Sequence, residues 1–149
     1  MGEKSGENSS AYTVGEIVAL RREAEQLQLC GRSKLDSYTP AELQEICNGI
    51  GADWMPEIMR ELLTALSPFA EAAAMIHDVE YFEGGGASER EAAVRRFREN
   101  IVRTAKRSYG WYHPLRYLAM VRAECFYLLL RTFGTAAWKE REVADAEHQ

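Results

Sequence analysis

Apolar residues recur along most of the chain at intervals of three and four positions, which is the spacing of one face of an α-helix. The first such stretch starts near Thr13, and Gly31 is expected to end it, because glycine commonly follows a helix C-terminus. The chain should then form a loop over residues 32–38. The apolar face of this first helix comprises Val14, Ile17, Val18, Leu20, Ala24, Leu27 and Leu29.

A second, shorter helix is predicted after this loop. Thr39 and Glu42 fit a capping box, in which each side chain hydrogen-bonds the backbone of the other residue, and Pro40 suits the first helical position. This helix is expected to end at residues 48–49, where a glycine-containing stretch begins. A further helical segment should span residues 57–66.

Three consecutive glycines at positions 84–86 separate two strongly helical segments. Because glycine propagates a helix poorly, the chain should turn there and pack the two helices as an antiparallel hairpin. The first helix is expected from Phe69 to Phe82, and the second from a capping box at residues 88–91 to about Arg107. The inner face of the second helix should comprise Val94, Phe97, Ile101 and Ala105.

Pro114 starts a last long helix, and Gly134 is expected to interrupt it. No segment alternates apolar and polar residues as a strand does, so the predicted fold class is all-α. We expect residues 1–11 to be disordered, residues 12–138 to form a single helical domain, and residues 139–149 to form a polar C-terminal tail. Uncharged residues share one face of the last helix: Leu118, Val121, Cys125, Leu128 and Thr132.

Composition fits one folded domain: the 149 residues are 46% hydrophobic and 28% charged. No apolar run approaches the roughly 18 residues of a membrane-spanning helix, and the N-terminus has no apolar signal-peptide core. We therefore expect a cytoplasmic protein, or one exported without a cleaved signal. Cys30, Cys47 and Cys125 are odd in number and widely spaced, which favours reduced, partly buried thiols over a zinc site or disulfides.

Charge is distributed unevenly along the chain. Residues 1–89 hold 6 Lys/Arg and 16 Asp/Glu, a net of −10, whereas residues 90–149 hold 12 and 7, a net of +5. The basic part could meet phosphates of lipid or nucleic acid. We favour the interpretation that these residues solvate two outer helix faces.

His77, Asp78 and Tyr81 form the group most typical of a functional site. Tyr81 follows His77 by four residues and so shares its helix face, whereas Asp78 is rotated by about 100°. Adjacent side chains diverge on a helix, so His77 and Asp78 are not a catalytic dyad. They can serve one site only if the imidazole faces one part of it and the carboxylate another.

His-Asp-x-x-Tyr on the first helix of a hairpin, at residues 76–81, resembles the motif of the phospholipase A2 superfamily. The upstream segment, residues 47–54, resembles the glycine-containing calcium loop of that family. Arg95-Arg96-Phe97 on the second helix makes the layout similar to bacterial and phage-encoded members. The resemblance covers residues 47 to about 100, roughly a third of the chain, and implies a phospholipase A2-like core with extra N- and C-terminal helices. It also implies a cytoplasmic or phage-associated product.

The resemblance implies calcium-dependent hydrolysis of the sn-2 ester of a glycerophospholipid. His77 would be the general base with Tyr81 beside it, and its imidazole would act near the unperturbed pKa of about 6.5. Asp78 would bind Ca²⁺ through its carboxylate. Backbone carbonyls of Asn48, Gly49 and Gly51 would complete the hard oxygen ligands, and the ion would stabilise the oxyanion.

One position departs from the family pattern. The family carries an Asp on the second helix that orients the catalytic histidine, but Val94 occupies that place here. An apolar side chain cannot orient an imidazole, so the expected activity is weak or lapsed. Glu91, one turn earlier, is a possible substitute. The alternative is a non-catalytic interaction or structural protein of phage or prophage origin on the same scaffold.

An aromatic cluster lies between the second hairpin helix and the last helix. It could form an interfacial platform for a phospholipid surface, or it could stack single-stranded nucleic acid. We favour a third interpretation, a packed corner between two helices, and nucleic acid is the partner we expect least. A protein partner stays open. The cluster comprises Tyr109, Trp111, Tyr112 and Tyr117, among Lys106, Arg107 and Arg116.

Overall fold

The computed structural model describes residues 12–49, 61, 65 and 70–147 of the chain. No strand occurs in this part of the chain, so the all-α prediction is confirmed. The predicted helix at residues 57–66 lies mostly outside the described residues, as does the segment 1–11. The elements are α1 (Val14–Gln26), the 3₁₀ helix η1 (Arg32–Ser37), α2 (Pro40–Gly49), α4 (Glu71–Glu83), α5 (Ala87–Ser108) and α6 (Pro114–Glu147).

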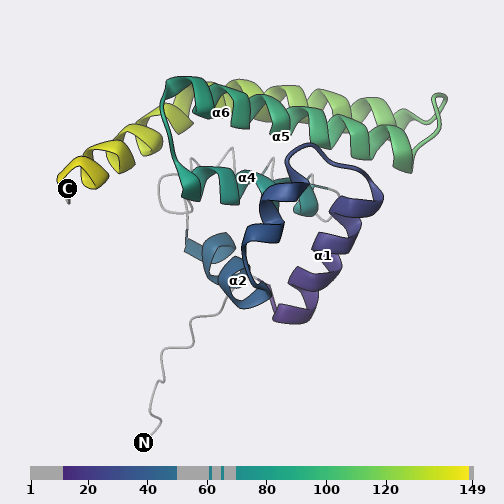
Figure 1. Cartoon of the computed structure of the whole chain (residues 1–149). Coiled ribbons are helices and arrows are strands. Elements are labelled where there is room, and N and C mark those ends of the chain that lie inside the picture. The colour runs from purple at the N-terminus through teal and green to yellow at the C-terminus, as the bar shows by residue number, and fades with distance from the viewer. Residues whose placement is uncertain (1–11, 50–60, 62–64, 66–69, 148–149) are drawn as a thin grey trace, which may run out of the picture.

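The helices are arranged in layers around α4 and α5. Figure 1 shows α5 and α6 as a long pair, with α4 beside α5 and with α1 and α2 on the far side of α4. The core lies where these layers meet. Its largest fully buried apolar side chains are Ile17, Leu29, Leu35, Leu43, Met75, Ile76, Val79, Val94 and Ile101.

The predicted start of the first helix near Thr13 and the predicted capping box at Thr39 are confirmed. The hydroxyl of Thr13 accepts a hydrogen bond from the backbone N–H of Glu16 at 3.1 Å, at the start of α1. At the start of α2, the backbone N–H of Glu42 donates to the Thr39 hydroxyl, and the backbone N–H of Thr39 donates to Glu42, each at 3.2 Å. Short polar side chains thus satisfy amides that have no partner inside their own helix.

The end of α1 differs from the prediction. The helix stops at Gln26, five residues before Gly31, and the predicted loop at residues 32–38 is mostly the 3₁₀ helix η1. Gly31 instead has a φ of 84° at the entrance to η1, a conformation that side chains with a Cβ rarely adopt. A Cβ there would also lie 3.1 Å from the side chains of Glu80 and Ile76. Gly31 therefore allows a close approach to α4 rather than a helix end.

The predicted hairpin of α4 and α5 is confirmed, with a different start for α5. Gly84 and Gly85 have φ values of 74° and 118°, which turn the chain back alongside α4 (Figure 1). The predicted capping box at residues 88–91 is not the start of α5. The helix begins two residues earlier, at Ala87, and only half of a capping box forms there: the backbone N–H of Gly86 donates to the Glu89 carboxylate at 3.0 Å.

Helix α6 departs most from the sequence-based expectation. It continues through Gly134, where an interruption was predicted, and residues 139–147 of the expected tail belong to it. At 1.5 Å per residue, α6 is about 50 Å long and α5 about 33 Å. The C-terminal part of α6 consequently extends beyond the other helices (Figure 1).

The apolar face of α6 that packs on α5 is not the row of uncharged residues identified in the sequence. The buried positions are Ala119, Ala123, Phe126, Tyr127 and Leu130. The sequence-identified row lies on the outer surface: Leu118, Val121, Cys125, Leu128 and Thr132 are all exposed. A helix of this kind is apolar on two sides, and the pattern alone does not show which side meets the core.

Basic residues of α5 hold the N-terminal third in place rather than merely solvating an outer face. Arg103 donates to the carbonyl of Gln28 at 2.6 Å, and Arg107 donates to the carbonyl of Gln26 at 3.1 Å. Both carbonyls lie at the C-terminal end of α1, where the helix dipole favours positive charge. These two arginines are exposed, so they face solvent as predicted and also tie α5 to the end of α1.

Among the described residues, no helix combines the length and the apolar character needed to cross a bilayer.

Candidate functional site

His77 lies on the face of α4 that meets α5. Its ring centroid is 5.0 Å from that of Phe97 and 5.3 Å from that of Tyr81. Only 9% of the residue is exposed. The predicted neighbourhood of His77 and Tyr81 is therefore present, but it is a packed aromatic seam between two helices.

The imidazole has no orienting partner at one of its nitrogens. Nδ1 of His77 is buried and has no hydrogen-bond partner. Burial lowers the pKa of His77 from its usual 6.5 to about 4, and a hydrogen bond with the backbone of Ala93 opposes this only in part. The expected near-ordinary pKa is therefore wrong. His77 is neutral at pH 7 and a weaker base than an exposed imidazole.

The wall of α5 opposite His77 is apolar, as the sequence indicated. Val94 is buried together with Phe97 and Ile101, so the predicted inner face and register of α5 are confirmed. Glu91, considered as a substitute for the missing carboxylate, is exposed and does not line the buried ring. No side-chain carboxylate of the described residues hydrogen-bonds His77.

Asp78 faces a different part of the molecule, toward the end of α2. Burial raises the pKa of Asp78 well above its usual value. Its charge adds to the effect of burial in raising the pKa of Cys47 to about 12, and it contributes to raising the pKa of Tyr12 to about 12. Tyr12, Cys47 and Asp78 are therefore neighbours, although they lie far apart in the sequence.

Of the predicted calcium ligands, Asn48 and Gly49 are the last residues of α2 and follow Cys47, whose thiol feels the charge of Asp78. Gly51 lies outside the described residues. In the part of the chain that the structure describes, no three His, Cys, Asp or Glu side chains form a group that could hold a metal ion. Backbone carbonyls would have to supply most of the ligands.

The pair His77-Asp78 thus has the divided arrangement that the helix period required. The imidazole points into the seam with α5, and the carboxylate lies on the side of α1 and α2. Tyr81, 5% exposed, shares the seam with His77, and burial raises the pKa of its phenol to about 12 while Arg90 lowers it. The phenol can donate a hydrogen bond at neutral pH, but it carries no charge there.

A buried ion pair lies one turn from His77, and no sequence pattern indicated it. The side chain of Glu80 is 2% exposed, and its Oε1 accepts a hydrogen bond from Nε of Arg96 at 2.6 Å. Nζ of Lys34 lies 3.7 Å from the same oxygen, whereas Oε2 is buried without a partner. Three elements, η1, α4 and α5, meet at this carboxylate. A pair sixteen residues apart could be found only once the hairpin register was known.

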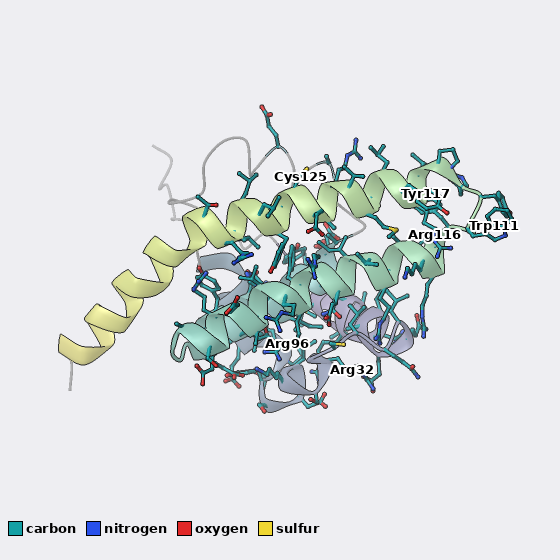
Figure 2. All side chains as sticks on the ribbon, turned by 90° about the horizontal axis from the view of Figure 1, so that it is seen from above. Arg32, Arg96, Trp111, Arg116, Tyr117 and Cys125 are labelled. Carbon is teal, nitrogen blue, oxygen red and sulfur yellow. The ribbon has the colours of Figure 1, made fainter. Side chains whose placement is uncertain are left out.

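The aromatic cluster forms a protruding turn rather than a packed corner, so that interpretation is wrong. Trp111 and Tyr112 are each 74% exposed. Figure 2 places Trp111 at the end of the α5–α6 hairpin, with Arg116 and Tyr117 beside it. The ring of Tyr109 lies 4.7 Å from that of His113, and the Tyr117 hydroxyl donates to the carbonyl of Trp111.

An open depression of about 440 Å³ lies along α5 and is lined by basic side chains. Most of its cations already have partners. Arg98 donates to Glu124 at 3.2 Å, and Arg103 and Arg107 bind the end of α1. The depression is a shallow basic surface, and it lies away from the His77 seam. Its lining residues are Arg98, Glu99, Val102, Arg103, Lys106 and Arg107.

Comparison of the chain with protein-family models, with curated proteins and with solved structures finds no match. The resemblance to phospholipase A2 therefore depends on the residues between 47 and about 100 alone.

Proposed function

We propose that this chain is a non-catalytic helical interaction protein on a phospholipase A2-like scaffold. Its role would reside in the exposed outer face of α6 and in the protruding α5–α6 turn. The motif at residues 76–81 would then be a remnant of ancestry that now serves packing.

The state of His77 carries this proposal. A general base must reach water or substrate. His77 is enclosed by Phe97 and Tyr81, its Nδ1 has no partner, and burial lowers its pKa to about 4. The backbone of Ala93 is its hydrogen-bond partner, and apolar Val94 stands where the resemblance would require a carboxylate. These features favour a packed residue over a working base.

Fatty-acid release from mixed phospholipid micelles containing calcium tests the proposal. The wild type and His77→Ala should both release fatty acid at the rate of a sample without protein. Release by the wild type that disappears in His77→Ala would overturn the proposal. Because truncation of a buried ring weakens packing, His77→Gln, which keeps volume and polarity, is the second variant.

The second candidate function is the calcium-dependent lipid ester hydrolase, weak in rate. It is favoured by one observation, the position of Asp78 beside Cys47 at the end of α2. There a carboxylate and the carbonyl end of a helix could hold a hard cation. Ca²⁺ would polarise the ester carbonyl of a bound phospholipid, and water would be the nucleophile.

Thermal unfolding with and without calcium examines this second candidate. A bound cation would compensate the charge of the buried Asp78 carboxylate. Tm should therefore rise with increasing Ca²⁺, and Asp78→Asn should abolish the rise. Val94→Asp adds the missing carboxylate and should raise fatty-acid release if the scaffold still supports the chemistry. An unchanged Tm in millimolar Ca²⁺ would remove the metal site.

A further inference from the structure

The end of the α5–α6 hairpin concentrates the positive charge of this chain. Residues 95–122 contain eight Lys/Arg and one Asp/Glu, a net of +7, whereas the whole chain has a net of −5. The depression along the C-terminal half of α5 lies within this segment, and all but two of its lining residues are cationic. A local charge of this size attracts polyanions even though the protein as a whole is acidic.

The cations of the depression are held in place, but only one of them is paired with a carboxylate. Arg98 lies 3.2 Å from Glu124. Arg103 and Arg107 donate to backbone carbonyls at the end of α1, which carry no net charge. Lys106 is exposed and has no hydrogen bond or ion pair within the described part of the chain. Three cations therefore keep their charge, and two of them are fixed to present it.

The aromatic side chains beyond the depression are fixed as well. Trp111 and Tyr112 are each 74% exposed, and their rings stand at 88° with centroids 5.9 Å apart. A Cβ on Gly110 would lie 2.9 Å from Cε1 of Tyr112, so this ring rests against the backbone of the turn. The Tyr117 hydroxyl donates to the carbonyl of Trp111. Rings that local contacts already hold lose little conformational freedom when a partner stacks on them.

The depression leads directly into the aromatic turn, defined as residues 109–117. The backbone N–H of Tyr109 closes α5 on the carbonyl of Ala105 at 3.0 Å, next to Lys106. From Arg98 to Tyr109 the helix rises about 16 Å. Figure 2 shows Arg116 beside Trp111 at the end of this path. Cations and exposed rings thus follow one another along one strip of the surface.

The combination of cations and exposed rings is typical of surfaces that bind single-stranded nucleic acid, where cations contact phosphates and rings stack on bases. In a duplex the base faces are already stacked on one another. A bilayer is flat, so it could touch the protruding turn but could not enter the depression on the flank of α5. The sequence, which does not reveal the depression, placed nucleic acid last among the partners. The structure reverses that order.

We propose that the depression and the aromatic turn together bind single-stranded nucleic acid without strong sequence preference. Arg103, Lys106 and Arg107 contact phosphates of the strand, and bases stack on Trp111 and Tyr112. The inference rests on the proposed interaction role, since it names the partner of the protruding turn.

Fluorescence anisotropy of a labelled oligothymidylate of about 12 nucleotides tests the phosphate contacts. Three neutralised phosphates predict that log K falls with log salt concentration with a slope of about −2, and Lys106→Gln should make this slope shallower by about 0.7. Arg95→Gln is the matched control, because it removes the same charge from an exposed position of α5 about 16 Å from Lys106 along the helix. It should leave the slope unchanged.

Substitutions in the aromatic turn test the stacking. Trp111→Ala should weaken binding about 10-fold, whereas Trp111→Phe, which keeps a ring, should retain most of the affinity. Phe82→Ala removes an exposed ring near the start of α5, far from the turn, and should bind as the wild type does. Helical content and Tm of each variant establish that it is folded.

A duplex of the same length and vesicles with and without phosphatidylserine are the competing probes. A duplex bound as tightly as the single strand, or equal affinity of the wild type and Trp111→Ala, would indicate charge attraction alone and overturn the inference. Binding to anionic vesicles without binding to the oligonucleotide would assign the surface to lipid and overturn it too, as would binding to none of the probes.

None of these results would affect the fatty-acid assay, which tests the non-catalytic role separately. Conversely, release that depends on His77 would end the proposed function while leaving the affinity for the oligonucleotide unchanged. The two proposals can therefore fail independently.

Discussion

Two polar side chains are buried at the inner face of α5, and their surroundings differ sharply. Asn100 is fully buried on α5, where its Oδ1 accepts from the backbone N–H of Cys30 at 2.8 Å and its Nδ2 donates to the carbonyl of Cys30 at 2.9 Å. His77 reaches this face from α4 and packs on Phe97, with Nδ1 buried and unpartnered. The amide of Asn100 is paired at both its oxygen and its nitrogen, whereas one nitrogen of His77 has no partner.

The difference separates a structural polar group from a residue retained for another reason. Asn100 ties the link between α1 and η1 to the hairpin, and each of its bonds replaces one to water. A buried nitrogen without a partner costs stability, so the fold does not explain His77. Either an ancestral reaction or a present ligand would explain it. The following substitutions compare buried polar groups that have partners with the two residues of the His77-Asp78 pair.

Arg96→Met should cause the largest loss of stability. It removes the close partner of Glu80, whose buried carboxylate would retain only Lys34 at 3.7 Å. We expect the free energy of unfolding to fall by about 3 kcal/mol, near the lower end for a broken buried pair. Urea denaturation measures this, and Arg95→Met at the exposed neighbouring position is the control. A loss no larger than that of the control would show that the pair contributes little.

Asn100→Ala should be the next largest effect. It leaves the N–H and C=O groups of Cys30 without their partner and opens a small cavity, so we expect a loss of about 2–3 kcal/mol. Glu99→Ala, one position earlier and exposed, should change stability by less than about 0.5 kcal/mol. Similar values for the two variants would mean that water replaces the Asn100 bonds at no cost.

Unlike the two preceding variants, His77→Leu should not lower the free energy of unfolding at pH 7. In the wild type the unfolded chain binds a proton at His77 below pH 6.5, whereas the folded chain binds it only near pH 4. Stability from this residue is therefore lost as the pH falls from 6.5 toward 4, and the loss between pH 7 and pH 5 is about 2 kcal/mol. His77→Leu should remove that dependence without loss at pH 7. An unchanged pH profile would show that the ring is solvated.

Asp78→Asn should have the smallest effect in the absence of calcium. Because burial raises the pKa of Asp78, the folded protein binds a proton that the unfolded chain releases as the pH rises above 3.8. The contribution of the Asp78 carboxyl to the free energy of unfolding thus declines with rising pH. The uncharged amide of the Asp78→Asn variant should remove this decline. Part of the side chain reaches solvent, so we expect a gain within about 1 kcal/mol at pH 7. A loss would indicate a cationic partner for the carboxylate.

Local signals in the sequence predicted the helices and several of their starts. The helix start near Thr13, the cap at Thr39, the glycine turn at residues 84–86 and the inner position of Val94 depend on neighbours within four residues. The all-α class follows from the same periodicity. The separate directions of His77 and Asp78 follow from the helix period alone.

Long-range partners were beyond the reach of the sequence. Nothing near Glu80 indicates Arg96, and nothing near Cys30 indicates Asn100, because such pairs depend on how helices pack. Periodicity showed an apolar row on α6 but not that the opposite face, with Phe126 and Leu130, meets the core. The interruption predicted at Gly134 rests on helix propensity, which is a weak guide inside a long helix.

The attachment of Cys30 to Asn100 has a consequence for how the protein opens. The hydrogen bonds between Cys30 and Asn100 join residues seventy positions apart, and Arg103 and Arg107 add further bonds at the end of α1. The first third of the chain cannot detach from the hairpin without breaking all of these bonds. In native-state hydrogen exchange, the Cys30 amide should therefore exchange only with global unfolding, because the N-terminal third and α5 open as one cooperative unit.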